Sequence, residues 1–304
     1  MDRVVRGHGL FFVEILFNLL YNNSNNYSGG GIMSVYPQNL HTHGILCDGK
    51  FDYEDMVKRA VELGFESIGF SGHSHTPFDE SYCMSLENTK VYKKRIADLK
   101  EKYAGVIDVY RGIEFDVFSD DNPKDYEYVI GDCHYIKCGS KYLPVDGSAR
   151  EVQECINKFF GGDGLEFAKA YYNNMALLTT LAKCDIVGHF DLLMKNNELC
   201  GYIDPLSSAY RSIALEALTA VAEKIKVFEI NVGSIARGYR SIPYPESFII
   251  KRIKEMGCGV VISSDCHHTD YLDTNFELGL QLAKDSGFNE VLIYTKDGFE
   301  GIKI

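Results

Sequence analysis

The sequence predicts an α/β protein built from βα units around a mostly parallel sheet or barrel. From Val35 onward, short β-rich runs alternate with segments of helical periodicity. No internal repeat, coiled-coil heptad or long linker interrupts this alternation, and 304 residues suit one α/β domain. Ionisable side chains also follow the β-rich runs, as they do where parallel strands end at a common mouth. We therefore expect residues 33–304 to form a single domain.

The candidate strands are β-rich runs that stop at polar residues. Their ends lie near His43, Ser71, Glu114, His134, His189, Asn231 and Ser264, and a weaker run covers residues 291–294.

The candidate helices carry apolar residues three and four positions apart and are bounded by capping residues. Asp52 can cap a helix over residues 53–63, with Gly64 at its end. Asp163 in GDGLEF is interpreted as another cap, because this segment lacks the spacing of a phosphate-binding glycine loop. Residues 139–148 are expected to form a loop. Further helices are expected at residues 88–103, 149–159, 165–182, 208–224, 245–256 and 276–286.

Residues 1–32 differ from the rest of the chain. A basic start precedes an apolar stretch that Glu14 and Asn18 interrupt, and an Asn/Ser/Gly-rich run follows. A signal peptide needs an uninterrupted apolar stretch and a small-residue cleavage site, and this apolar part is too short to cross a bilayer. We interpret residues 1–32 as a disordered or non-native leader before Met33, with a secretory leader as the alternative.

Composition narrows the class of protein and its partners. With 45% hydrophobic and 24% charged residues, the chain can bury a substantial core. Its net charge of −12 argues against nucleic acid as a partner, although local metal charge can still attract a small anion. Nine cysteines without a CxxC pair indicate reduced thiols. We expect a cytoplasmic protein with no membrane partner, and the oligomeric state is not fixed by the sequence.

Ionisable side chains gather at the ends of the candidate strands. Apart from His8, every histidine follows a β-rich run, in NLHTHG, GFSGHSHTPF, VIGDCHY, DIVGHFD and VISSDCHH. Because the carboxyl ends of parallel barrel strands converge on one mouth, these side chains are expected to meet there. The histidines are His41, His43, His73, His75, His134, His189, His267 and His268, and the carboxylates are Asp48, Glu114, Asp116, Asp191 and Asp265.

Spacing within these segments points to metal binding. Residues i and i+2 of a strand lie on one face, so such a pair can reach the same cation. A lone histidine at a strand end is more often structural, but several pairs together make chance a poor explanation. Packing so many ionisable groups together is costly unless bound cations compensate them. The pairs are His41 with His43, Glu114 with Asp116, and Asp265 with His267.

The types of donor atom limit which metal ions can bind and which reaction they can support. Mixed nitrogen and oxygen donors without thiolates suit Zn²⁺, Fe²⁺ or Mn²⁺. Two or three such ions bridged by a carboxylate are a common device for hydrolysis, because one lowers the pKa of a water while a pair holds the phosphoryl oxygens. Glu114 is the only glutamate in the set and is the natural bridging candidate. The sequence therefore predicts a metal-dependent phosphoester hydrolase.

In this order, the segments resemble the polymerase-and-histidinol-phosphatase (PHP) superfamily, in particular its histidinol-phosphate phosphatases. The resemblance covers about residues 38–295 and includes HTHGILCDG, GFSGHSHTPF, RGIEFD, DIVGHFDLLMK, EINVGSIARGYR and ISSDCHH. The opening and closing metal motifs are shared across the superfamily, whereas DIVGHFDLLMK and ARGYR point to the phosphatase branch. The resemblance implies a distorted, TIM-like (β/α)₇ barrel with a trinuclear metal site.

The resemblance also implies which residues hold the metals. Two features depart from the family pattern: Gly72 stands where members often have Asp, and His75 is an additional histidine. A residue that orients His73 is therefore missing or replaced. We expect His75 to orient a ligand or contact substrate, and His268 to be structural. The implied ligands are His41, His43, Asp48, His73, Glu114, His134, His189, Asp265 and His267.

A phosphorylated substrate also needs positive charge and a proton donor. Arg237 and Arg240 in SIARGYR follow another candidate strand, and arginine suits bidentate phosphate binding. Surface arginines are the alternative interpretation. Asp191, two residues beyond His189, can protonate the leaving alkoxide or orient a ligand. We expect Asp191 and Arg237 to be catalytic, and Arg237, Arg240 and His75 to contact substrate.

By resemblance, the chain is expected to hydrolyse L-histidinol phosphate to L-histidinol and phosphate, a late step of histidine biosynthesis. The expected partner is thus a small phosphorylated molecule. One alternative is a phosphoesterase of the same superfamily acting on another small phosphomonoester or a nucleotide phosphodiester. A second alternative is a non-catalytic metal-binding module, against which the nine filled ligand positions argue.

Overall fold

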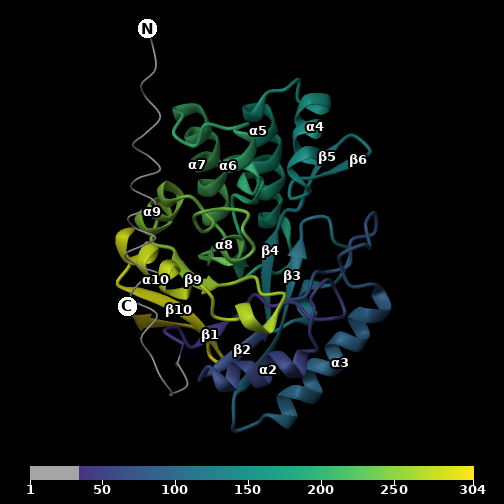
Figure 1. The fold of residues 1–304 in the computed structure, drawn as a ribbon, viewed down its shortest axis with the longest axis vertical. Coiled ribbons are helices and arrows are strands. Elements are labelled where there is room, and N and C mark those ends of the chain that lie inside the picture. The colour runs from purple at the N-terminus through teal and green to yellow at the C-terminus, as the bar shows by residue number, and fades with distance from the viewer. Residues whose placement is uncertain (1–33) are drawn as a thin grey trace. The chain divides into compact units, whose positions relative to one another are not determined.

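A parallel barrel organises the chain (Figure 1). The computed structural model describes residues 34–304, so the predicted leader lies outside the described residues. Seven parallel strands form one sheet in the order β1-β2-β3-β4-β7-β8-β9, whose edges nearly meet where Thr42 pairs with Cys266. The predicted barrel is thereby confirmed. The strands are β1 (Gln38–Asn39), β2 (Ser67–Phe70), β3 (Asp108–Asp116), β4 (Tyr128–Asp132), β7 (Ile186–Val187), β8 (Val227–Asn231) and β9 (Gly259–Ser263).

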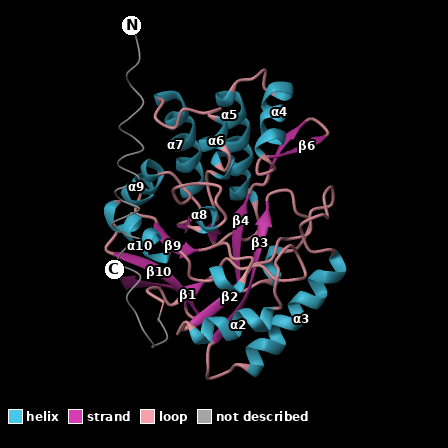
Figure 2. Ribbon diagram, in the orientation of Figure 1, coloured by secondary structure: helices cyan, strands magenta, loops and turns pink. Residues whose placement is uncertain are grey.

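Helices cover the outside of the barrel. Figure 2 shows α2 and α3 beside β2, and α4 to α7 grouped beyond β4. The predicted caps are confirmed, because the Asp52 side chain accepts from the Glu54 amide and the Asp163 side chain accepts from the Leu165 amide. No helix within residues 34–304 is long and apolar enough to span a membrane. The α-helices are α2 (Tyr53–Glu62), α3 (Leu86–Lys102), α4 (Ala149–Phe159), α5 (Gly164–Met175), α6 (Asn197–Cys200), α7 (Ser208–Ala222), α8 (Gly233–Ala236), α9 (Ser247–Glu255) and α10 (Phe276–Asp285). The 3₁₀ turns are η1 (Pro123–Asp125), η2 (Ala176–Thr180), η3 (Leu192–Met194) and η4 (Thr269–Tyr271).

Two apolar layers hold the barrel together. Alternation along each strand sends residues such as Phe228 and Ile230 outward to the helices, and residues such as Val227 inward. The strand β10 (Glu290–Thr295) confirms the weaker strand prediction, but it pairs in a hairpin with β11 (Gly298–Lys303) rather than joining the barrel sheet. Its Leu292 and Tyr294 pack against the inner layer. The inner layer consists of Leu40, Tyr110, Tyr128, Ile130, Ile186, Val227 and Val261.

The expected loop at residues 139–148 is partly wrong. Strand β5 (Tyr135–Cys138) pairs antiparallel with β6 (Lys141–Pro144), and Gly139 takes a positive φ of 60° in the turn between them. The Phe78 ring stacks on Tyr142, with centroids 3.6 Å apart. This packing comes from a segment about sixty residues earlier, which a local sequence pattern does not reveal.

The expected helix over residues 165–182 is too long. Helix α5 ends at Met175, the chain continues as the 3₁₀ turn η2, and Leu181 is already extended. The hydroxyls of Thr179 and Thr180 donate to the backbone carbonyls of Ala176 and Leu177, at 2.8 and 2.7 Å. Such local side-chain bonds compete with regular helix, so the segment stops early.

Candidate metal centre

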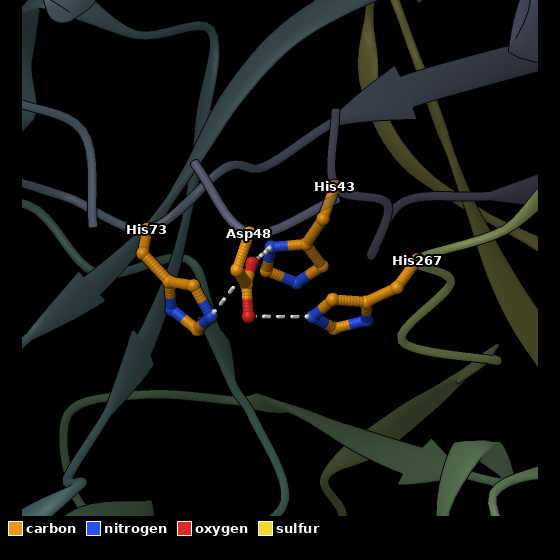
Figure 3. Close-up of side chains that lie close together, drawn as sticks. All are labelled: His43, Asp48, His73 and His267. Atoms are coloured by element: carbon orange, nitrogen blue, oxygen red, sulfur yellow. Dashed lines mark hydrogen bonds and ion pairs between the residues drawn. The ribbon is translucent and has the colours of Figure 1, made fainter. Parts of the chain in front are cut away.

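Nine side chains converge where the barrel strands end. They form four overlapping groups, in each of which the donor atoms lie within 4.8 Å of one another. Figure 3 shows one group, in which His43, His73 and His267 surround Asp48. Together, the groups contain the same nine residues that the family resemblance implies as ligands. The groups are His43, Asp48, His73 and His267; His41, Glu114 and His189; His41, His43 and Asp265; and His73, Glu114 and His134.

The carboxylate of Glu114 lies at the centre of this cluster. Its Oε1 atom faces the Nε2 atoms of three histidines, and its Oε2 atom faces two others. Burial would raise the pKa of Glu114, but the charges of His73 and His41 lower it well below its ordinary value. This position is the one expected of a bridging carboxylate. The distances from Oε1 are 3.4 Å to His41, 3.3 Å to His134 and 3.0 Å to His189, and those from Oε2 are 2.6 Å to His73 Nδ1 and 3.5 Å to His43 Nε2.

Three further carboxylates contact three of these histidines on the side away from Glu114. Each contacts the Nδ1 atom and leaves Nε2 directed at Glu114. In metal proteins such partners fix the tautomer and orientation of a ligating imidazole. The pairs are Glu229 Oε1 with His41 at 2.6 Å, Asp132 Oδ1 with His189 at 3.0 Å, and Asp116 Oδ2 with His134 at 3.3 Å.

Sequence reasoning missed two of these three carboxylates. Glu229 is the single acidic residue within the strand VFEIN, and Asp132 is the single acidic residue at the end of the strand YVIGD. An acidic residue in a mainly apolar strand was the available signal. Asp116 was placed with Glu114 on one strand face, but it lies behind His134 and belongs to none of the four donor groups.

Burial and neighbouring charges shift the pKa values in this cluster in opposite directions. Burial raises the pKa of Asp132 to about 7. Burial would lower the pKa of His189, but Asp132 and Glu114 raise it to about 8. For His43, burial and the nearby His267 and His73 lower the pKa to about 3. The protonation of each histidine and carboxylate in the cluster therefore depends on the charges of its neighbours.

Unpaired buried atoms indicate that the cluster suits cations. His41 Nε2, His43 Nε2 and Asp48 Oδ1 are buried and have no hydrogen-bond partner among residues 34–304. Buried polar atoms normally have partners, so unpartnered atoms gathered at one place need an explanation. All three belong to the donor groups, whose imidazole nitrogens and carboxylate oxygens are suitable ligands for Zn²⁺, Fe²⁺ or Mn²⁺. The residues present therefore fit a divalent-metal site.

Only one of the two candidate arginines reaches this cluster. Arg237 Nη2 donates to Asp265 Oδ2 at 2.7 Å, and its Nη1 lies 3.1 Å from His267 Nδ1. Arg240 instead donates to Glu246 at 2.6 Å and is almost fully buried, with 1% of its side chain exposed. The surface alternative is therefore wrong for Arg240, and its contact with substrate stays a prediction.

Asp191 belongs to the buried network of Arg240. It is fully buried, its Oδ2 accepts from the Glu246 amide at 2.9 Å, and its Oδ1 lies 3.8 Å from Arg240 Nη1. Burial raises the pKa of Asp191 to about 6, although Arg240 opposes the rise. Asp191 thus contacts Arg240 and Glu246 rather than a residue of the donor groups, and its catalytic role stays a prediction.

The two additional histidines lie outside the donor groups. Both nitrogens of His75 are engaged, with Nδ1 2.6 Å from Asp120 and Nε2 2.8 Å from Glu80. His268 caps the turn η4 by accepting from the Asp270 amide at 3.2 Å, in agreement with its expected structural role.

The space beside Gly72 is also occupied. A Cβ atom at this position would lie 3.2 Å from Cys47 Sγ and 3.4 Å from Met84 Cε. A carboxylate there would displace these neighbours, which is consistent with glycine at this position.

Fold and donor set together define a parallel barrel with a metal centre at its mouth. The family model described as "PHP domain" matches residues 39–233, which is more than half of the chain. The chain therefore belongs to the PHP domain family, as its motifs indicated.

Curated proteins and solved structures are similar to this chain. Two of them are curated proteins named "Probable histidinol-phosphatase". The protein from Deinococcus radiodurans is 26% identical, and the match covers 81% of this chain and 92% of that protein. The protein from Schizosaccharomyces pombe is 22% identical, and the match covers 86% of this chain and 90% of that protein. A structure from Listeria monocytogenes, described as a candidate histidinol phosphatase, has a TM-score of 0.71 at 20% identity, covering 79% of this chain and 98% of that one. The histidinol phosphate phosphatase of Lactococcus lactis was solved with zinc, L-histidinol and phosphate. It has a TM-score of 0.59 at 19% identity, and the match covers 87% of this chain and 98% of that one.

Proposed function

We propose that this protein is a metal-dependent histidinol-phosphatase, which hydrolyses L-histidinol phosphate to L-histidinol and phosphate. The observation that carries the proposal is the convergence of nine histidine and carboxylate donors at the mouth of a PHP barrel. The names of the two curated relatives, and the zinc, histidinol and phosphate bound to the Lactococcus lactis structure, support the choice of substrate. The nine residues would hold two or three Zn²⁺, Fe²⁺ or Mn²⁺ ions.

The chain's own residues have separable tasks in this proposal. Divalent ions would supply positive charge to the phosphoryl oxygens and lower the pKa of an attacking water. Glu114 joins two donor groups, and the carboxylates behind the histidines keep the rings oriented. Arg237 is the guanidinium at this centre, and it can bind phosphate oxygens through two parallel hydrogen bonds.

Phosphate release from L-histidinol phosphate by the metal-loaded protein tests the proposal. We expect His267→Ala to lower kcat/KM by at least roughly 10³-fold, as removal of a catalytic group typically does. The adjacent His268→Ala is the matched control, because His268 lies outside the donor groups, and it should retain wild-type activity.

The same assay separates the alternatives. Faster turnover of a nucleotide phosphodiester, or of a generic phosphomonoester, would overturn the assignment of substrate. Metal-loaded protein that hydrolyses none of these compounds would leave only the non-catalytic metal-binding module.

A further inference from the structure

We propose that Glu229 is a positioning residue, whose single buried carboxylate holds two ligand-bearing segments in place and thereby sets the metal affinity of the site. The inference rests on the metal centre of the proposed function. It assigns to Glu229 a role that does not require contact with substrate or metal.

Glu229 lies on the inner face of β8. Phe228 and Ile230 belong to the outer apolar layer, and Val227 belongs to the inner one. Because side chains alternate along a strand, Glu229 and Asn231 therefore point into the barrel with Val227. Glu229 is 1% exposed. A carboxylate at such a position needs compensating donors, because burying an unpaired charge is costly.

Four donors satisfy the two oxygens of Glu229. His41 Nδ1, 2.6 Å away, and the Ser263 hydroxyl bond to Oε1. The backbone amide of His189, at 2.8 Å, and Asn231 Nδ2, at 3.0 Å, donate to Oε2. A carboxylate accepts about four hydrogen bonds, so this one is saturated. One side chain thus connects the segment after β1, the segment after β7, and the strands β8 and β9.

These contacts determine how two candidate ligands face the centre. Since Glu229 can only accept at His41 Nδ1, it favours the tautomer that carries a proton there and offers Nε2 to a metal ion. That Nε2 atom is one of the orphaned buried atoms of the cluster. The bond to the His189 amide fixes the backbone from which the second imidazole projects, 3.0 Å from Glu114. Removing a carboxylate that hydrogen-bonds to a metal-ligating histidine typically lowers metal affinity by about 10–100-fold.

Glu229→Gln removes the charge at almost constant size. A glutamine presents one acceptor and one donor group, so its amide must oppose either the His189 amide or the His41 Nδ1 proton. We expect the zinc affinity, measured by chelator competition, to fall about 10–100-fold. We also expect histidine ¹⁵N NMR of the zinc-loaded protein to show the His41 Nδ1 proton in the wild type and its loss or shift in the variant. A purely structural role would leave this signal unchanged.

Two further variants keep the test decisive. Glu229→Asp retains the charge and should fold, but it is too short to reach His41 and the His189 amide together, so its zinc affinity should also fall. Asp185→Asn is the matched control, because Asp185 also accepts from a backbone amide, that of Val129 at 2.8 Å, but lies before β7 at the opposite end of the barrel.

The expected result is weaker zinc binding in both Glu229 variants and wild-type affinity in Asp185→Asn. Wild-type affinity in the Glu229 variants, or an equal loss in all three, would overturn the inference. Since the assay contains no substrate, wild-type protein that binds zinc without hydrolysing histidinol phosphate would contradict the proposed function, while the affinity ratio would still decide the role of Glu229. Wild-type protein that binds no divalent ion would overturn both.

Discussion

Replacing Glu114 by glutamine should disable the metal centre more severely than loss of any residue that belongs to one donor group. The substitution keeps the shape of the side chain and exchanges one oxygen for an amide nitrogen. The oxygens of Glu114 face five imidazoles at 2.6 to 3.5 Å. The new amide would direct hydrogen atoms at two or three of these nitrogens, and a full negative charge would be lost.

The size of the effect follows from the membership of Glu114 in two of the four groups, one with His41 and His189 and one with His73 and His134. Loss of a residue that only hydrogen-bonds to a metal ligand lowers the affinity of one metal site by about 10–100-fold. Loss of a direct ligand should lower it at least as much. Two affected positions give a combined loss of about 10²–10⁴-fold, or about 3–5.5 kcal/mol. Because catalysis depends on the occupied site, kcat/KM should fall by at least about 10³-fold.

Chelator competition and phosphate release measure the two effects on one preparation. Glu154→Gln is the matched control, since Glu154 is an exposed residue of α4 that pairs only with Arg150 among the described residues, and it should behave as wild type. Metal affinity within threefold of wild type in Glu114→Gln, together with normal turnover, would refute the bridging role.

Two further predictions concern stability. Chelation should lower the Tm of the metal-loaded protein by about 4–5 °C for each site that was saturated at 100 times its Kd, because such binding stabilises the folded state by about 2.7 kcal/mol. A calorimetric Tm that chelation and metal re-addition leave unchanged would contradict this. Arg240→Met should lower the free energy of unfolding in urea by about 3–5 kcal/mol, because it leaves Asp191 and Glu246 without their buried counter-charge. An unchanged urea midpoint with a raised KM would instead support the phosphate-contact role that the sequence suggested for Arg240.

The sequence was sufficient for the parallel βα arrangement and for the gathering of donors, because both follow from local patterns, whereas the choice of a seven-stranded barrel came from the family resemblance. A β-rich run that ends in a histidine or carboxylate marks a strand end, and parallel strands bring their ends to one mouth. The caps Asp52 and Asp163 were recognisable for a similar reason, since they act on amides within three residues.

Roles that depend on contacts between distant segments could not be predicted. Spacing alone did not distinguish Glu114, which faces five imidazoles, from Asp116, which stands behind His134. Glu229 takes its role from His41, 188 positions away, and the burial of Arg240 beside Glu246, with which it pairs at 2.6 Å, also depends on tertiary packing. The hairpin of β5 and β6 was missed because the aromatic ring that stacks on it, Phe78, belongs to an earlier loop.

Anomalous X-ray diffraction from crystals of the zinc-loaded protein would test the central claim most directly. We predict two or three anomalous peaks inside the cluster of nine donors, with at least one within about 2.0–2.2 Å of both a histidine nitrogen and an oxygen of Glu114. Peaks confined to other parts of the molecule, or no peak among these residues in zinc-saturated crystals, would contradict the claim that these side chains share divalent cations.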